Sequence, residues 1–188
     1  MKRVIGIAAA ALAAALLQGC FPLAVTGVAT GALVVTDRRT AGTYLEDETI
    51  EWKVFGLRGN YPGAHIDATS FNRRVLLTGE VPSEEAKKKI EEEVRRIENV
   101  KEVTNELQVA GASSLASRGS DSLITSNVKA RMVNNRYFSP VHVKVLTEAG
   151  VVYLMGLVTQ QEGDAAVEVA RNTSGVVRVV KVFEYITR

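Results

Sequence analysis

One residue of this chain has a type and a position that together point to a defined covalent chemistry. Cys20 is the only cysteine among the 188 residues, and it follows a segment that starts with Met1-Lys2-Arg3 and continues as an apolar run from Val4 to Leu17. This order is typical of a secretory signal peptide, and the run is too short to predict a membrane-spanning helix. We therefore predict a signal peptide over residues 1–19 and a mature chain that begins at Cys20.

The residues Leu16-Leu-Gln-Gly-Cys20 resemble the bacterial lipobox, whose cysteine is acylated. Leu17, Gly19 and Cys20 fit that pattern, whereas Gln18 is less usual at its position. The resemblance implies that Cys20 is a lipid attachment site with an N-acyl group, such as palmitate, and an S-diacylglycerol, and we expect no other cofactor. A buried structural cysteine is the alternative, because lone cysteines are commonly buried. The position of Cys20 argues against it.

The residue after the cysteine bears on where the protein is anchored. Several acyl chains give stable anchoring where one gives only marginal binding, so a lipidated Cys20 would attach the protein to a membrane without a spanning helix. Phe21 stands where an Asp would imply retention in the inner membrane, so the resemblance implies the periplasmic face of the outer membrane. With its one thiol acylated, the chain has no disulfide, and its core alone must hold the fold.

Residues suited to other chemistries are few. A hydrolase needs a nucleophile, a base and an orienting group, and the chain has only two histidines, His65 and His142. They fall at equivalent positions of two repeats, so we predict two separate surface histidines rather than a metal pair. Gly-rich phosphate loops and serine elbows are missing, and Asn172-Thr-Ser174 is interpreted as a chance match to the glycosylation triplet. We therefore predict that the protein is not an enzyme.

Charge is divided unevenly along the chain. Removal of Lys2 and Arg3 with the signal peptide leaves 21 basic and 21 acidic residues. Residues 41–110 carry 10 basic and 14 acidic side chains, whereas residues 118–188 carry 9 basic and 6 acidic ones. A cationic half points to an anionic partner, and in an envelope protein a phospholipid headgroup is a better candidate than nucleic acid. The excess is modest, so ordinary solvated surface charge is an equal alternative.

The same series of patterns occurs twice, and such a repeat decides how the whole fold is read. The matched segments are Asp47-Glu-Thr-Ile50 with Asp121-Ser-Leu-Ile124, Val75–Val81 with Val152–Val158, and Asn99–Val103 with Gly175–Val179.

Each repeat begins with a helical pattern. We interpret Asp47 and Asp121 as the N-caps of these helices. Trp52 and Phe55 lie near the apolar stripe of the first helix, so we predict that they pack in the core. The stripes follow helical spacing and consist of Ile50, Val54 and Leu57 in the first repeat and of Ile124, Val128 and Met132 in the second.

A hairpin, a second helix and a last strand complete each repeat. Alternating residues flank turns at Asn72-Arg73 and Ala149-Gly150, which predicts two hairpins whose strands end at Gly79 and Gly156. Ser83 and the Thr159/Glu162 capping box predict the starts of the second helices, and Asn99 and Gly175 predict their ends. The last strands are predicted over Val100–Val109 and Val176–Ile186.

The order α-β-β-α-β, with a helical crossover that returns the third strand to the hairpin, predicts an α+β fold. In each unit a three-stranded mixed sheet is covered on one face by two helices. Units of this length are near the lower limit for a self-sufficient core, so packing of the two on each other stays open. The expected parts are a signal peptide (1–19), a lipidated flexible tether (20–40), a first domain (41–110), a linker (111–118) and a second domain (119–188).

The repeated pattern resembles the BON domain of bacterial envelope proteins. The residues that carry the resemblance include Val75-Leu-Leu-Thr-Gly79 in the first repeat and Val151–Thr159 with Ser174-Gly175-Val176 in the second. Asp37 with Arg39, in the segment ahead of the repeats, also fits. Two such domains behind a lipobox resemble the dual-BON outer-membrane lipoproteins associated with cell division and envelope stress.

The resemblance implies that the second domain binds anionic phospholipid of the outer membrane through its first helix, from Asp121 to Asn134, and that the protein supports envelope integrity and collects at division sites. With the apolar stripe turned inward, that helix would expose an apolar residue between cations, which suits an interfacial helix. The candidate phospholipid-binding residues are Arg118, Leu123, Ser126, Asn127, Lys129, Ala130 and Arg131.

Two alternatives stay open. Leu123 could pack against the first domain or a loop, since a single surface leucine needs no explanation. The protein could also be a scaffold whose first domain docks an envelope assembly or division protein, with the lipid serving only localisation. We expect a monomer in either case.

Overall fold

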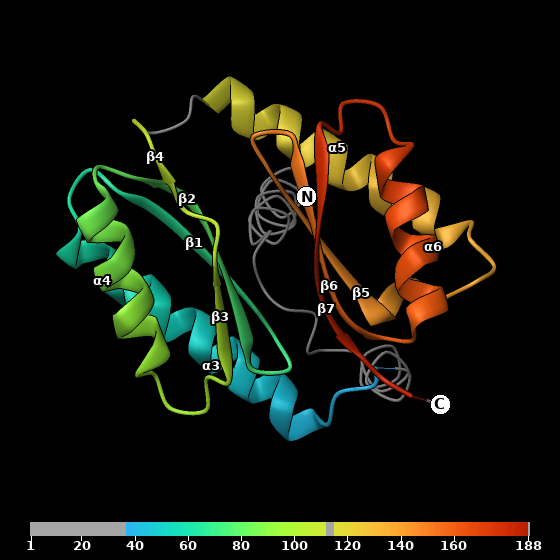
Figure 1. Ribbon diagram of the computed structural model, residues 1–188, viewed down its shortest axis with the longest axis horizontal. Coiled ribbons are helices and arrows are strands. Elements are labelled where there is room, and N and C mark those ends of the chain that lie inside the picture. The colour runs from blue at the N-terminus through green and yellow to red at the C-terminus, as the bar shows by residue number, and fades with distance from the viewer. Residues whose placement is uncertain (1–36, 112–114, 188) are drawn as a thin grey trace, which may run out of the picture. The chain divides into compact units, whose positions relative to one another are not determined.

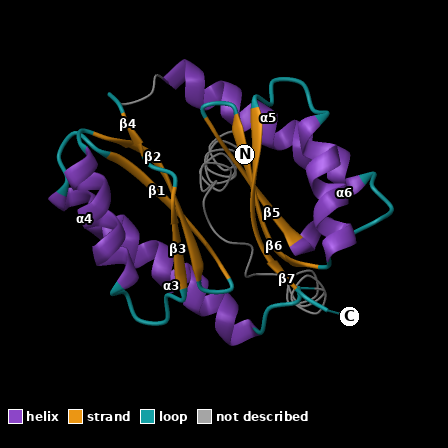
Figure 2. Ribbon diagram, viewed as in Figure 1, coloured by secondary structure: helices purple, strands orange, loops and turns teal. Residues whose placement is uncertain are grey.

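Two α-β-β-α-β units follow one another along the chain (Figures 1 and 2). The computed structural model describes residues 37–111 and 115–187, and for Leu115 and Ala116 only the backbone. The predictions for the signal peptide, for Cys20 and for the tether up to Thr36 lie outside these residues. The two α-β-β-α-β units, from Asp37 onward, together form one compact body.

The first unit contains two long helices and a mixed sheet. Strand β2 pairs antiparallel with β1 and parallel with both β3 and β4, so β3 and β4 together take the place of the single last strand that was predicted. The elements are α3 (Ala41–Leu57), η1 (Arg58–Asn60), β1 (His65–Phe71), β2 (Arg74–Val81), α4 (Glu84–Arg95), β3 (Glu102–Asn105) and β4 (Gln108–Val109).

The second unit repeats this order with an unbroken last strand. Strand β6 lies between β5, to which it is antiparallel, and β7, to which it is parallel. The elements are α5 (Leu115–Val133), η2 (Pro140–His142), β5 (Val143–Glu148), β6 (Val151–Val158), α6 (Gln160–Arg171) and β7 (Arg178–Tyr185). The predicted α+β fold with two helices on one face of each sheet is confirmed (Figure 2).

Each unit has its own core between the helices and one sheet face. Ile50 and Val54 of α3 pack with Ile90 and Val94 of α4 against the first sheet, and Val128 and Met132 of α5 pack in the second core. The predicted apolar stripes are therefore the buried faces. A third cluster joins the units, because Phe71 and Leu76 of the first sheet pack against Tyr153, Met155 and Leu157 of the second.

The predicted N-cap role of Asp47 and Asp121 is wrong. Thr40 caps α3 with its side chain, and both aspartates lie inside their helices and are buried. Asp47 accepts hydrogen bonds from the backbone N–H groups of Asn72 and Arg73, as Asp121 does from Ala149 and Gly150. Each aspartate thus fastens a helix to the adjoining hairpin turn.

The hairpin turns are confirmed, but the strands continue past the predicted ends at Gly79 and Gly156 to Val81 and Val158. A β-carbon on Gly79, whose φ is +110°, would lie 2.1 Å from the carbonyl oxygen of His65, and one on Gly156 would lie 2.2 Å from that of His142. These glycines allow close approach of neighbouring strands rather than strand termination.

The boundaries of both predicted connecting segments differ in the structure. Helix α5 begins at Leu115, inside the predicted linker. Residues 37–40 were predicted as the end of a flexible tether, yet Arg38 donates two hydrogen bonds to the Glu162 carboxylate at 2.7 and 2.8 Å. Among the described residues, no helix is long and apolar enough to span a membrane.

Candidate functional site

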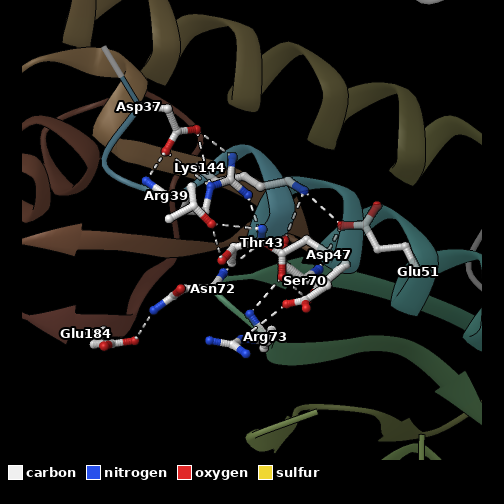
Figure 3. A network of polar contacts seen from close by, with 12 residues as sticks. Asp37, Arg39, Thr43, Asp47, Glu51, Ser70, Asn72, Arg73, Lys144 and Glu184 are labelled. Carbon is white, nitrogen blue, oxygen red and sulfur yellow. Dashed lines mark hydrogen bonds and ion pairs between the residues drawn. The ribbon is translucent and has the colours of Figure 1, made fainter. Parts of the chain in front are cut away.

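A network of polar contacts fixes the start of α3 on the hairpin of the first domain and reaches the second (Figure 3). The Arg39 guanidinium binds the carboxylates of Asp37 at 2.7 Å and Asp47 at 2.9 Å and lies over the Phe71 ring at 4.0 Å. Burial alone would raise the pKa of Asp37, but the hydrogen bonds from Arg39 hold it below its usual value. One guanidinium thus joins two carboxylates, and these contacts hold the start of α3 in place.

Two contacts extend this network across the domains. The Lys144 ammonium donates to Glu51 at 2.9 Å, and the Asn72 amide donates to Glu184 at 2.8 Å (Figure 3). Together with the apolar cluster between the sheets, they define how α5 is presented relative to the first domain.

The outward face of α5 is apolar and small. Leu123 is 68% exposed, and Ser126, Ala130 and Val133 follow it at helical spacing with exposed side chains. Tyr137, four residues past the helix end, is 69% exposed. An exposed leucine near the middle of α5, a valine at its end and a tyrosine beyond that end form a surface that an amphipathic interface would favour.

The exposed charges that α5 itself carries are all positive. Asp121 is the only acidic residue of α5, and it is buried in its hydrogen bonds to the turn, whereas Lys129 and Arg131 are exposed. The corresponding helix α3 carries Glu46, Glu48 and Glu51 in addition to the buried Asp47. The two repeats therefore present helices of opposite charge.

A cleft of about 630 Å³ lies between α5 and the first domain. Arg118, Ser126 and Lys129 line it from α5, opposite His65 and Asp67 of β1. Glu148 also lines the cleft, and burial together with the charges of Glu80, Asp121 and Asp67 raises its pKa to about 7. The cleft thus has both cationic and acidic walls.

The structure divides the predicted phospholipid-binding residues into two groups. Arg118, Ser126 and Lys129 line the cleft, and Ser126 and Lys129 are exposed as well. Leu123, Asn127, Ala130 and Arg131 are exposed. Sequence reasoning missed two apolar members, Val133 and Tyr137. Val133 lies ten residues after Leu123 and outside the core stripe, and that spacing was a usable signal.

The prediction that both histidines are surface residues is wrong. The His65 side chain is 23% exposed and lies 3.4 Å from Asp67 and 3.3 Å from Glu80. The His142 side chain, in η2 rather than on a strand, is 15% exposed. The two come from different domains, as expected.

The prediction that Trp52 and Phe55 pack in the core is also wrong. Trp52 is 69% and Phe55 53% exposed, and their rings meet edge to face with centroids 5.9 Å apart. The Arg58 guanidinium lies 4.6 Å from the centre of the Phe55 ring. With Glu48 and Glu51, these residues line a depression of about 320 Å³ that we name the aromatic patch.

The comparisons with known proteins agree with the repeated fold. The model of the BON domain family matches residues 48–111 and 120–187. The chain is 40% identical over 174 residues to the outer membrane lipoprotein DolP of Haemophilus influenzae, covering 90% of each chain. It is 34% identical over 154 residues to a 21 kDa hemolysin of Actinobacillus pleuropneumoniae, covering 80% of this chain and 79% of that one.

One solved structure covers most of the fold at low similarity. The C-terminal domain of CdsD, a structural protein of the Type III secretion system of Chlamydia trachomatis, aligns with 71% of this chain and 96% of its own at 11% identity and a TM-score of 0.31. A score this low carries no argument about function. The two BON matches and the 40% identity over nearly the full length identify the family. The chain belongs to the BON-domain family as a dual-BON outer-membrane lipoprotein.

Proposed function

We propose that this lipoprotein, anchored by a lipid on Cys20 to the periplasmic face of the outer membrane, binds anionic phospholipid through α5 and thereby supports outer-membrane integrity and cell division. The name of the Haemophilus relative, an outer membrane lipoprotein, supports the location. The observation that carries the lipid-binding part is the contrast between the two first helices. Only α5 combines exposed cations with no exposed acid and an exposed apolar strip.

This arrangement suits a helix that lies in the plane of a membrane surface. Leu123 and Val133 can enter between headgroups while Lys129 and Arg131 remain at the phosphate level. Each cation near an anionic surface contributes about 1 kcal/mol, and that attraction decays within a Debye length. The interaction is therefore expected to weaken with salt.

Vesicle binding by the mature chain with Cys20→Ser tests this proposal, because it removes the anchor and leaves the domains intact. We call this protein the soluble chain. It should sediment with phosphatidylglycerol-containing vesicles and much less with pure phosphatidylcholine vesicles. Leu123→Asp should abolish binding, since it places a carboxylate where an apolar side chain meets the headgroups.

Leu45→Asp is the matched control. Leu45 is 66% exposed on α3, close to the exposure of Leu123, but it belongs to the acidic helix. This variant should bind vesicles like the parent protein. Equal binding to neutral and anionic vesicles, or equal loss in both variants, would contradict the proposal.

A second candidate function, a protein-docking scaffold, is favoured by the aromatic patch. Tryptophan and arginine are enriched among the residues that dominate protein interfaces. Trp52 and Phe55 of α3 are exposed next to Arg58 on the first domain, whereas the proposed lipid-binding helix belongs to the second. A photo-crosslinking residue at Phe55 should capture an envelope protein in cells, and Trp52→Ala should reduce that capture. Capture of lipid alone would argue against the scaffold.

A further inference from the structure

Three potential metal ligands from two domains converge beside the cleft. His65 and Glu80 are opposite each other in the register of the β1–β2 hairpin, and Glu148 ends strand β5 of the second domain. One ligand atom from each residue lies within 4.8 Å of the other two. The Nδ1 of His65 and Oε2 of Glu80 are 3.3 Å apart. This spacing is suitable for ligands that share one ion, because bonds of about 2.0 to 2.2 Å place neighbouring ligands about 3 Å apart.

The converging atoms lack hydrogen-bond partners. Nδ1 of His65, Oε2 of Glu80 and Oε1 of Glu148 are buried and make no hydrogen bond. Glu80 is 7% exposed. A buried polar atom without a partner costs about 1 to 3 kcal/mol, so three such atoms, in residues whose ligand atoms gather within 4.8 Å, call for a common partner.

A cation fits this position better than a water molecule. The carboxylates of Glu80, which is buried, and of Glu148, which is partly buried at the cleft, lie together, and a positive charge between them would relieve their repulsion. The Nε2 of His65 lies 3.4 Å from the Asp67 carboxylate. A carboxylate near the far nitrogen favours a proton on Nε2 and leaves Nδ1 as the ligand, an arrangement common for histidines that bind metals.

We propose that His65, Glu80 and Glu148 form a site for a divalent transition-metal ion of the zinc type that joins the two BON domains. One imidazole nitrogen with two carboxylates favours such an ion over magnesium or calcium, which prefer oxygen ligands alone. The ligand set spans the domain boundary, so the ion would strengthen their association. The site does not depend on the proposed lipid binding.

Calorimetric titration of the metal-free soluble chain with zinc chloride tests the site, and Cys20→Ser here also removes a competing thiol. One zinc ion should bind per chain and raise the melting temperature. Replacement of one ligand, as in His65→Gln or Glu148→Gln, should weaken binding at least about tenfold. The melting curves of the metal-free variants report whether each variant is folded.

His142→Gln is the matched control, because His142 occupies the equivalent position of the second repeat and offers an imidazole without the two glutamates. Zinc affinity in this variant should match that of the parent. Absence of zinc binding, retention of full affinity in Glu148→Gln, or an equal loss in His142→Gln would overturn the proposal. If Glu148→Gln stabilises the metal-free protein and the parent binds no zinc, the two glutamates share a proton and do not bind a metal ion.

Discussion

At the scale of single residues, buried carboxylates hold the helices to the hairpins. Asp47 accepts hydrogen bonds from Ser70 and from two backbone N–H groups of the turn, and it pairs with Arg39. Asp47→Ala should lower the free energy of unfolding by about 3 to 5 kcal/mol, because it leaves the buried donors of Ser70 and of the turn without their acceptor and removes one of the two carboxylates that pair with Arg39. Urea denaturation measures the change. Glu48→Ala, one position along at an exposed site, should shift stability by less than about 0.5 kcal/mol.

A second residue-scale prediction concerns acid stability. Hydrogen bonds from Arg38 lower the pKa of Glu162 to about 2, below its value in the unfolded chain. The folded state therefore binds fewer protons, so the stabilisation is complete above about pH 4.5 and is lost as the pH falls toward about 2. Arg38→Ala should cost about 1 kcal/mol at neutral pH, since the pair is partly open to solvent.

Denaturation of both proteins across the acid range tests this assignment. The difference between parent and Arg38→Ala should shrink as the pH falls. Arg95→Ala, which removes an exposed i,i+4 pair with Glu91, should show a smaller loss at neutral pH. A difference between parent and Arg38→Ala that stays constant down to the lowest pH would rule out Glu162 as its source.

At the scale of elements, the two glycines inside the hairpins let the strands approach. Gly79→Ala should destabilise the protein by more than about 2 kcal/mol, because the new methyl group meets the carbonyl of His65 at a positive φ. Gly56→Ala makes the same chemical change in α3, where nothing lies within 4 Å, and should stabilise by up to about 1 kcal/mol. Thermal unfolding of the two variants provides the comparison, and similar shifts in both would show that strand approach does not govern Gly79.

At the scale of the whole molecule, neighbouring leucines of β2 serve different interfaces. Leu76 packs between the two sheets, and Leu77 packs under the helices of its own domain, although both are fully buried. Either substitution to alanine should cost about 2 to 5 kcal/mol. Leu76→Ala should additionally speed amide hydrogen exchange in β6 of the other domain, where Tyr153 and Met155 lose a contact. Equal exchange in β6 for Leu76→Ala and Leu77→Ala would show that this cluster does not couple the domains.

Local sequence patterns were sufficient for the elements and the fold class. The stripe of Ile124, Val128 and Met132, the Thr159/Glu162 capping box and the turn at Asn72-Arg73 are all determined by residues within one or two turns of chain, so periodicity and capping rules reach them. The prediction that Leu123 is exposed followed from the same helical spacing. The predicted helix starts at Asp47 and Asp121 were wrong, because an aspartate that can cap a helix can equally well accept hydrogen bonds from the backbone of a distant turn.

Contacts between polar residues that are distant in the sequence became visible in the folded chain alone. Arg38 donates a hydrogen bond to Glu162, which is 124 residues away in the sequence, and His65 lies close to Glu148 of the other domain. Such pairs leave no periodic signal, since they join residues that are far apart in the sequence. Exposure of Trp52 and Phe55 was decided at this level too, because helical spacing places them beside the core stripe without saying where the sheet ends. Two BON domains with oppositely charged first helices therefore follow from local sequence patterns, whereas the cleft between the domains and the proximity of His65 to Glu148 depend on how the domains pack.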